Sequence, residues 1–315
     1  MDNIAKKGVQ LIRDSGIEAD EKDGLNEEQL SEIIADYDAM IVRSATKVTP
    51  KIIAAAGKMK AVSRAGVGLD NVDIQAATGK GIFVFNTPEG NTIAVAEHAI
   101  GLMIALNRHI AKADASMKRG EWEKKAFKGN ELQGKTLGLI GFGRIGREVA
   151  KRAHAFGMKI VVADPFAKEE HVMEANASLV QLDELLAQAD TISLHVPLTE
   201  QTRGMINADT ISKMKDGAKI VNTARGGAIN EADLVQALKS GKLGGAGLDV
   251  FAKEPLENSE LTSLGNVILT PHIASATKEA QDKCGVEAAQ QIIRALKENN
   301  TYGAVNYQAL SAGKN

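Results

Sequence analysis

A glycine-rich turn that follows an apolar segment constrains the fold of this chain more than any other feature. Residues 136–140 favour a strand, and Gly141, Gly143 and Gly146 follow with the spacing G-x-G-x-x-G. Residues 143–156 then repeat apolar side chains with a helical period. In such a unit the first glycine makes the turn, the second lets a pyrophosphate approach, and the third lets the helix pack on the strand. The sequence therefore predicts a strand–turn–helix unit that binds a dinucleotide at the helix N-terminus.

The next apolar segment ends in an acidic residue that predicts which dinucleotide binds. Residues 159–163 favour a second strand, and Asp164 follows it, 18 positions after Gly146. A carboxylate about 20 residues after the glycine motif typically accepts hydrogen bonds from the ribose hydroxyls. It would repel a 2′-phosphate, so we expect NAD rather than NADP. The alternative is a glycine-rich turn beside a surface aspartate, which the whole strand–turn–helix unit disfavours.

Composition limits the classes of protein to which the chain can belong. Its 315 residues suggest about two domains, and its net charge of −2 comes with no basic stripe for nucleic acid. Cys284 is the single cysteine, which excludes an intramolecular disulfide and suits a reducing compartment. The longest apolar stretch, residues 94–106, is too short and too polar to span a bilayer, and the N-terminus lacks a secretory signal. We therefore expect a soluble, cytoplasmic protein with no nucleic-acid or membrane partner.

Alternating strands and helices predict an α/β fold with doubly wound parallel sheets. Apolar segments at 39–42, 60–63 and 81–85 alternate with helices, and later strands are expected to end near residues 140, 163, 180, 195, 222, 249 and 270. We also expect a helix over 2–14 capped by Asp2, a long helix over 92–118 and a closing strand over 302–306. The last helix follows a complete sheet, so it should return to the first domain. The predicted domains are residues 1–90 with 276–315, and residues 91–275.

Three strand ends in the second domain carry reactive side chains. Arg225, Glu254 and His272 each follow an apolar strand, and ligands of parallel sheets lie at the carboxyl ends of strands. Histidine can accept or donate a proton near neutral pH, and a carboxylate beside it favours the imidazolium. Arginine can hold a substrate carboxylate and polarise its neighbouring carbonyl. Individually these residues could cap a strand, bind loop carbonyls or make a turn, but together they predict hydride transfer involving a secondary alcohol.

Other candidate chemistries have weaker support. His195 also ends a strand, before Val196 and Pro197, and is assigned to a cofactor loop rather than to a second base. The remaining histidines lie on predicted helices, and no Cys/His cluster has the spacing of metal ligands. No G-x-S-x-G motif indicates a hydrolase.

The glycine motif, residues 222–227, residues 249–255 and the Pro271-His272 pair together resemble the D-2-hydroxyacid dehydrogenase family. The resemblance covers nearly the whole chain. It implies a Rossmann-type NAD domain inserted in a flavodoxin-like substrate domain, and a homodimer in which the Trp122 loop lies at the interface. Residues 42–49, 64–73, 86–91, 113–122 and 277–281 resemble the members that oxidise a small phosphorylated 2-hydroxy acid, 3-phospho-D-glycerate.

The resemblance also implies a role for each matching residue. Arg225, Glu254 and His272 match the catalytic triad of the family. The expected NAD contacts are Gly141, Gly143, Arg144, Ile145, Gly146, Asp164, His195, Val196, Pro197, Thr223, Ala224, Asp249 and Ala274. The expected substrate contacts are Arg43, Ser44, Arg64, Ala65, Gly66, Val67 and Asn91.

The chain departs from its relatives in three respects. The first strand of the substrate domain is apparently missing, because the sequence begins with the predicted helix. The chain also ends without the C-terminal regulatory domain that many relatives carry, so feedback through such a domain is not expected. Val67 and Val196 stand where relatives often have threonine, so no side-chain hydrogen bonds are expected there.

Two other functions remain open at this stage. One is the reduction of hydroxypyruvate or glyoxylate, which needs the same triad but no phosphate site. The other is a binding function, in which the NAD domain acts as a sensor in a dimer, as in the corepressor relatives of the family. The Arg43-Ser44 stretch, which would face the phosphate, argues against the binding function. Removal of Arg43 would separate the other two functions, because only the phosphorylated substrate should depend on it.

Overall fold

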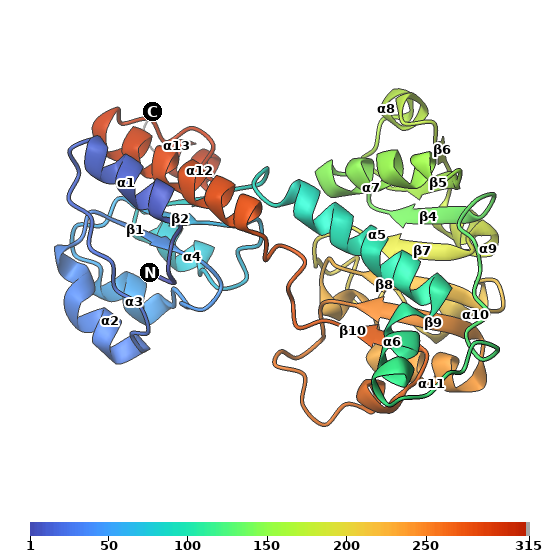
Figure 1. Cartoon of the computed structure of the whole chain (residues 1–315). Helices are drawn as coiled ribbons and strands as arrows, with labels where there is room; N and C mark the ends of the chain where they lie inside the picture. The colour runs from blue at the N-terminus through green and yellow to red at the C-terminus, as the bar shows by residue number, and fades with distance from the viewer. Residues whose placement is uncertain (313–315) are drawn as a thin grey trace. The chain divides into compact units, whose positions relative to one another are not determined.

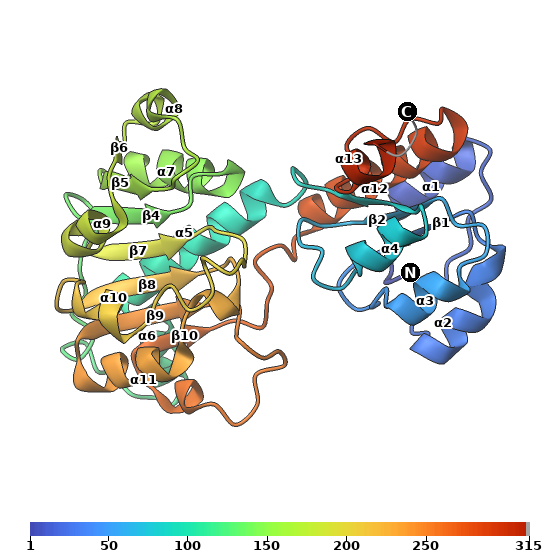
Figure 2. The ribbon, with the colours of Figure 1, turned by 180° about the vertical axis from the view of Figure 1, so that it is seen from behind.

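The computed structural model describes residues 1–312 and divides the chain into two compact units. One unit contains Met1–Thr92 and the segment that begins at Ala276, and the other contains Ile93–Ser275. Each unit has a parallel sheet with helices on both faces (Figures 1 and 2). The predicted α/β class with two parallel-sheet domains is therefore confirmed. None of the helices in residues 1–312 has the length and apolar character needed to cross a membrane.

The larger unit contains a seven-stranded parallel sheet in the order β10-β9-β8-β7-β4-β5-β6. The chain runs from β4 outward through β5 and β6, then returns and continues from β7 to β10 on the other side. The carboxyl ends of β4 and β7 therefore flank the point where the strand order reverses, which is where such sheets bind their ligands. The strands are β4 Thr136–Ile140, β5 Lys159–Ala163, β6 Ser178–Leu179, β7 Thr191–Leu194, β8 Ala218–Asn222, β9 Leu243–Leu248 and β10 Val267–Leu269.

Two apolar cores cover the faces of this sheet. Leu137, Leu139 and Val162 pack with side chains of α5 and α7 on one face, and Ile140, Ile192 and Ile220 pack with those of α9, α10 and α11 on the other. These strands are hydrophobic on both faces, as in other parallel sheets that helices cover. The helices are α5 Thr92–Arg108, α6 Ile110–Lys118, α7 Arg144–Ala155, α8 Glu169–Glu174, α9 Leu182–Gln188, α10 Ala208–Ser212 and α11 Glu231–Ser240.

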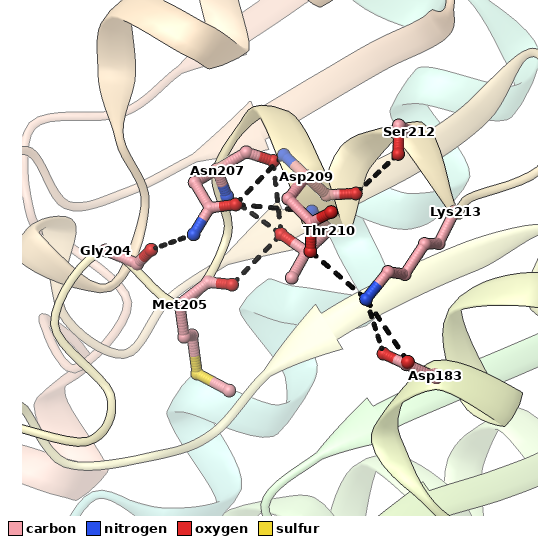
Figure 3. A network of polar contacts seen from close by, with 8 residues as sticks. All are labelled: Asp183, Gly204, Met205, Asn207, Asp209, Thr210, Ser212 and Lys213. Atoms are coloured by element: carbon pink, nitrogen blue, oxygen red, sulfur yellow. Dashed lines mark hydrogen bonds and ion pairs between the residues drawn. The ribbon is translucent and has the colours of Figure 1, made fainter.

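A polar network joins α9 to α10 on one of these faces (Figure 3). Asn207 caps α10 by accepting hydrogen bonds from the backbone N–H groups of Asp209 and Thr210, at 3.1 and 3.2 Å. Lys213 forms ion pairs with Asp209 at 3.1 Å and with Asp183 of α9 at 3.2 Å. The network fixes the short α10 beside its neighbour, away from the glycine turn.

The smaller unit contains a three-stranded parallel sheet in the order β1-β2-β3. Its strands are β1 Ala39–Val42, β2 Ala61–Arg64 and β3 Phe83–Asn86. One face packs on α2 Glu27–Ile33, α3 Pro50–Ala55 and α4 Ile74–Gly79, and the other packs on α1 Lys6–Asp14 and α12 Lys278–Lys297 (Figure 1). At the crossing of α1 and α12, a Cβ on Gly8 would lie 2.4 Å from the carbonyl oxygen of Gly285. Glycine at that position therefore allows the two helix backbones to touch.

The beginning of the first helix was predicted wrongly. The helix starts at Lys6 rather than near Asp2, and Asp2 has a left-handed backbone with φ of 62°. Its carboxylate accepts hydrogen bonds from the backbone N–H groups of Arg43 and Thr46, at 2.8 and 3.0 Å. Asp2 therefore ties down the loop after β1, which is a distant contact that a local capping rule does not anticipate.

The long helix predicted over 92–118 is two helices. His109 has a left-handed backbone with φ of 55°, and it separates α5 from α6. A left-handed residue ends the run of α-helical hydrogen bonds, so α6 starts in a new direction.

The closing strand predicted over 302–306 does not form. The segment contains turns and leads into α13 Tyr307–Ser311. Asn306 takes the place of a pairing strand beside β3, because its side chain accepts from the N–H of Val84 and donates to the carbonyl of Ile82, both at 2.9 Å. The backbone N–H of Val305 adds one bond to the carbonyl of Val84 at 2.8 Å.

Candidate active site

The glycine turn lies at the point where the strand order of the larger sheet reverses. Gly141 has φ of 95°, and a Cβ there would lie 2.6 Å from the carbonyl oxygen of His195, which follows β7. A Cβ on Gly146 would lie 2.4 Å from the carbonyl oxygen of Gly141. Gly143 is exposed, and a Cβ on it would meet nothing within 4 Å. Packing within the chain thus accounts for Gly141 and Gly146, whereas Gly143 leaves open space beside the N-terminus of α7.

Asp164 holds this turn from the end of β5. Its carboxylate accepts hydrogen bonds from the backbone N–H groups of Phe142, at 2.7 Å, and Phe166, at 2.8 Å. The sequence predicted Asp164 as a cofactor ligand but not as a support for the turn. Arg144 is exposed and Ile145 is half-buried in the first turn of α7, which has no side-chain cap.

His195 fills the other side of the reversal point. Its backbone N–H donates to the carbonyl of Ile140 at 2.8 Å, and its Nε2 lies 2.9 Å from the hydroxyl of Ser193. Burial lowers the pKa of His195 to about 4. The imidazole is therefore neutral at physiological pH, as a structural residue requires. Val196 is half-buried and Pro197 is exposed beyond it.

The loop after β8 is ordered by the side chain of Asn222. This buried amide accepts from the backbone N–H of Ala224 at 3.0 Å and donates to the carbonyl of Arg225 at 2.9 Å. The Arg225 guanidinium donates to the carbonyl of Ala224 at 2.7 Å. Thr223 is also buried, and its hydroxyl has no hydrogen-bond partner among residues 1–312.

Glu254 and His272 form a hydrogen-bonded pair at the ends of the next two strands. Nδ1 of His272 lies 2.7 Å from Oε2 of Glu254. The other oxygen of Glu254 accepts from the backbone N–H of Phe251 at 3.0 Å, which orients the carboxylate. His272 has a left-handed backbone with φ of 54°, which is uncommon for a residue with a side chain and costs about 1–3 kcal/mol. Both side chains are solvent-accessible, so a substrate can reach the pair.

The Arg225 loop lies directly against the loop that carries Glu254. A Cβ on Gly226 would lie 1.9 Å from the carbonyl carbon of Phe251, so only glycine allows this contact. The structure thus brings together the loops of the three predicted catalytic residues at the ends of β8, β9 and β10, which are neighbours in the sheet.

The carboxylate of Asp249 binds the loop that follows β10. Its side chain is fully buried and accepts hydrogen bonds from the backbone N–H groups of Ile273 and Ala274, both at 2.8 Å, and from the hydroxyl of Thr270 at 2.6 Å. Burial by itself would raise the pKa of Asp249, but the neighbouring His98 side chain and hydrogen bonds from Thr270, Ile273 and Ala274 lower it below its ordinary value. The carboxylate is therefore ionised at neutral pH.

The residues predicted to bind substrate lie in the smaller unit, at the ends of its strands. Arg43 and Ser44 follow β1, and Arg64 ends β2. Asn71 donates to the carbonyls of Arg43 and Thr46, both at 2.7 Å, and so closes the loop after β1.

The loop after β2 is compact. The guanidinium of Arg64 lies over Gly66, where a Cβ would be 1.5 Å from Nη1. Ala65 and Gly66 are buried, and Val67 accepts a bond at its carbonyl from the Asn86 side chain at 2.7 Å. Asn91 lies further along the chain, and its buried Oδ1 has no hydrogen-bond partner among the described residues.

The described residues of the larger unit suit a dinucleotide. Gly143 leaves open space at the N-terminus of α7, and Asp164 offers an anionic group nearby. The buried Thr223 hydroxyl lacks a hydrogen-bond partner in the part of the chain that the structure describes. Within residues 1–312 no three His, Cys, Asp or Glu side chains gather as metal ligands would.

Comparison with known proteins identifies the family. A family model described as "D-isomer specific 2-hydroxyacid dehydrogenase, NAD binding domain" matches residues 100–274. The chain belongs to the D-isomer specific 2-hydroxyacid dehydrogenase family. Its larger unit is thus the NAD-binding domain, and the predicted cofactor is confirmed at the level of the family.

Relatives within the family carry more than one name. The hydroxypyruvate reductase of Thermotoga maritima is 52% identical over 298 residues, which cover 94% of this chain and 96% of that protein. The D-3-phosphoglycerate dehydrogenase of Synechocystis sp. is 48% identical over 310 residues, which cover 98% of this chain and 56% of that protein. The chain therefore spans a little over half the length of that second relative.

Solved structures of relatives share the fold over nearly the whole chain. The TT0316 protein of Thermus thermophilus superposes with a TM-score of 0.88 at 33% identity, covering 97% of this chain and 98% of that one. A glyoxylate reductase of Paecilomyes thermophila gives a TM-score of 0.87 at 34% identity, covering 97% and 96%.

Proposed function

We propose that this chain oxidises 3-phospho-D-glycerate to 3-phosphohydroxypyruvate with NAD, the reaction that begins serine biosynthesis. The observation that carries the chemistry is the 2.7 Å contact between His272 and Glu254, on loops adjoining the Arg225 loop. A histidine–carboxylate pair beside an arginine is what proton transfer at a 2-hydroxy acid requires.

The pair assigns the proton to one atom of His272. An ionised Glu254 can only accept hydrogen bonds, so Nδ1 of His272 carries the proton that they share. Nε2 then has a lone pair and takes the proton of the substrate hydroxyl. Glu254 stabilises the imidazolium that forms, and Arg225 holds the substrate carboxylate. Bound NAD supplies the hydride acceptor for the carbon that bears the hydroxyl.

We assign the NAD contacts to the residues around the glycine turn. The backbone N–H groups at the N-terminus of α7 would bind the pyrophosphate, and Asp164 would bind the ribose hydroxyls. The remaining contacts are those that the sequence predicted at the ends of β7 to β10, where Thr223 has a spare hydroxyl.

The phosphate of the substrate is assigned to the smaller unit. Arg43 and Arg64 stand at the carboxyl ends of neighbouring strands, and guanidinium groups match phosphate geometry. Ser44 adds an exposed hydroxyl, and the Ala65-Gly66-Val67 backbone and Asn91 are assigned to the substrate carboxylate and its surroundings.

Hydroxypyruvate reduction is the second candidate. The Thermotoga maritima relative of similar length bears that name, and the same His272, Glu254 and Arg225 would serve it in the reverse direction. The two candidates differ in whether a phosphate must be bound, which makes Arg43 the discriminating residue.

We also propose a cytoplasmic homodimer. Trp122, in the loop after α6, is 80% exposed, and Met117 and Ile110 of α6 are about half exposed, which is unusual for side chains of this size. Such exposed apolar groups are typical of an interface that a second copy covers. The lone, buried Cys284 suits a reducing compartment.

A steady-state assay of the two reactions tests the proposal. We expect Arg43→Gln to lower kcat/KM for 3-phosphoglycerate by about 10- to 100-fold, the usual cost of losing a charge-assisted hydrogen bond. Hydroxypyruvate reduction should change little. Lys47→Gln, which removes a neighbouring exposed charge, is the matched control. Wild-type turnover of hydroxypyruvate without turnover of 3-phosphoglycerate would establish the second candidate instead.

A further inference from the structure

His98 of α5 belongs to the network beneath the catalytic loops, although no motif in the sequence marked it. Its Nε2 lies 3.0 Å from the hydroxyl oxygen of Thr270 and 3.5 Å from Oδ1 of Asp249. The imidazole is less than a quarter exposed. Because α5 and β10 are far apart in the sequence, the contact exists only in the folded unit.

Which group donates each hydrogen bond in this network follows from the number of protons that each group carries. The Thr270 hydroxyl has one proton, which points to Oδ1 of Asp249 at 2.6 Å. Its oxygen can therefore only accept from His98, so Nε2 of His98 carries a proton and donates it. His98 thus completes a chain of donors that runs from α5 through Thr270 to the buried carboxylate.

This carboxylate holds the backbone on which His272 is placed. It accepts from the N–H groups of Ile273 and Ala274, while the Asp249 carbonyl accepts from the N–H of His272 at 2.9 Å. A left-handed residue persists only where surrounding contacts impose it. The conformation of His272, and with it the 2.7 Å contact to Glu254, therefore depends on where Thr270 and Asp249 are held.

We propose that His98 is a positioning residue for His272, acting through Thr270 and Asp249. This inference rests on the proposed function only in that His272 is taken as the proton-transfer group. His98 is not itself the proton-transfer group, so its substitution should displace His272 rather than remove the base. Displacements of about 1 Å at a catalytic group can lower the rate by as much as about 100-fold.

The test compares variants in which residue 98 keeps or loses the N–H group that donates to Thr270. We expect His98→Ala and Thr270→Val each to lower kcat by about tenfold, with KM for the hydroxy acid changed by less than about threefold. The double variant should lose no more than the worse single variant, because both break one chain of contacts. His98→Gln can still donate to Thr270 and should recover most of kcat. His154→Ala, on the exposed side of α7, is the control for removing an imidazole.

Hydrogen exchange at the amides of Ile273 and Ala274 gives a readout that needs no substrate. Exchange should accelerate in His98→Ala and return towards wild type in His98→Gln. The inference is overturned if kcat falls as far in His98→Gln as in His98→Ala. It is also overturned if His98→Ala leaves both kcat and the exchange rates unchanged. If the wild type turns over neither acid, the proposed function fails, and exchange alone then decides the role of His98.

Discussion

Both units use an aspartate to hold the loop after a strand, but they do so in different surroundings. Asp249 is fully buried and binds the loop that places His272. Asp2 is half-buried and comes from the beginning of the chain, and it binds the loop that carries Arg43. A hydrogen bond to a buried carboxylate is stronger, and its loss costs more, than one that water can replace.

The difference separates the residues proposed to carry the chemistry from those proposed to select the substrate. The buried Asn222 and Asp249 hold the loops of Arg225 and His272. The half-buried Asp2 and Asn71 hold the loop of Arg43 and Ser44. Loops at the surface, such as the one that carries Arg43 and Ser44, tolerate substitution more readily than loops held by buried groups. Relatives that are 48% and 52% identical to this chain carry the names of two different enzymes.

The largest effect is expected from His272→Ala. Loss of a general acid–base group typically costs about 10²- to 10⁴-fold in rate, and the loss should be equal for 3-phosphoglycerate and hydroxypyruvate because both need the same proton transfer. NADH binding, followed by fluorescence, should be retained. A loss smaller than about tenfold, or one confined to a single acid, would show that the proton passes through another group.

The sequence assigns a catalytic role to Arg225, Glu254 and His272 because each follows an apolar strand at one edge of a sheet, and that role stays a prediction. It could not predict what holds them. His98 and Thr270 are 172 positions apart, and nothing local distinguishes His98 from the other histidines on helices. The left-handed conformation of His272 likewise depends on bonds to Asp249 that form only when β9 and β10 pair.

Local rules failed where tertiary contacts compete with them. Asp2 looks like a helix cap, but its carboxylate binds backbone groups more than 40 positions away. Residues 302–306 look like a strand, but the Asn306 side chain already occupies the edge of β3. The strands of the larger unit were predicted well because their apolar runs are buried on both faces.

Asparagine at each of the two aspartates tests the comparison between the loops directly. In Asp249→Asn an amide N–H must face the Thr270 hydroxyl or a backbone N–H, so we expect the free energy of unfolding to fall by about 2–4 kcal/mol and kcat to fall with it. Asp2→Asn should cost less than about 1 kcal/mol, since water can replace the lost acceptor. Chemical denaturation measures both. Equal losses in the two variants would mean that burial does not distinguish the loops.

A further effect concerns pH and His195, at the end of β7 in the same sheet. Burial holds the pKa of His195 at about 4, below the ordinary value of 6.5, so as the pH falls the unfolded chain takes up this proton first. The residue therefore weakens the fold progressively from about pH 6.5 down to about pH 4, by about 1–2 kcal/mol at pH 5. His195→Gln can keep the contact to Ser193 without titrating, so its unfolding free energy should fall less than that of the wild type between pH 7 and 5. His154→Gln, at an exposed position, should follow the wild type. Parallel pH profiles for the wild type and His195→Gln would mean that His195 takes up its proton in the folded protein as readily as in the unfolded chain.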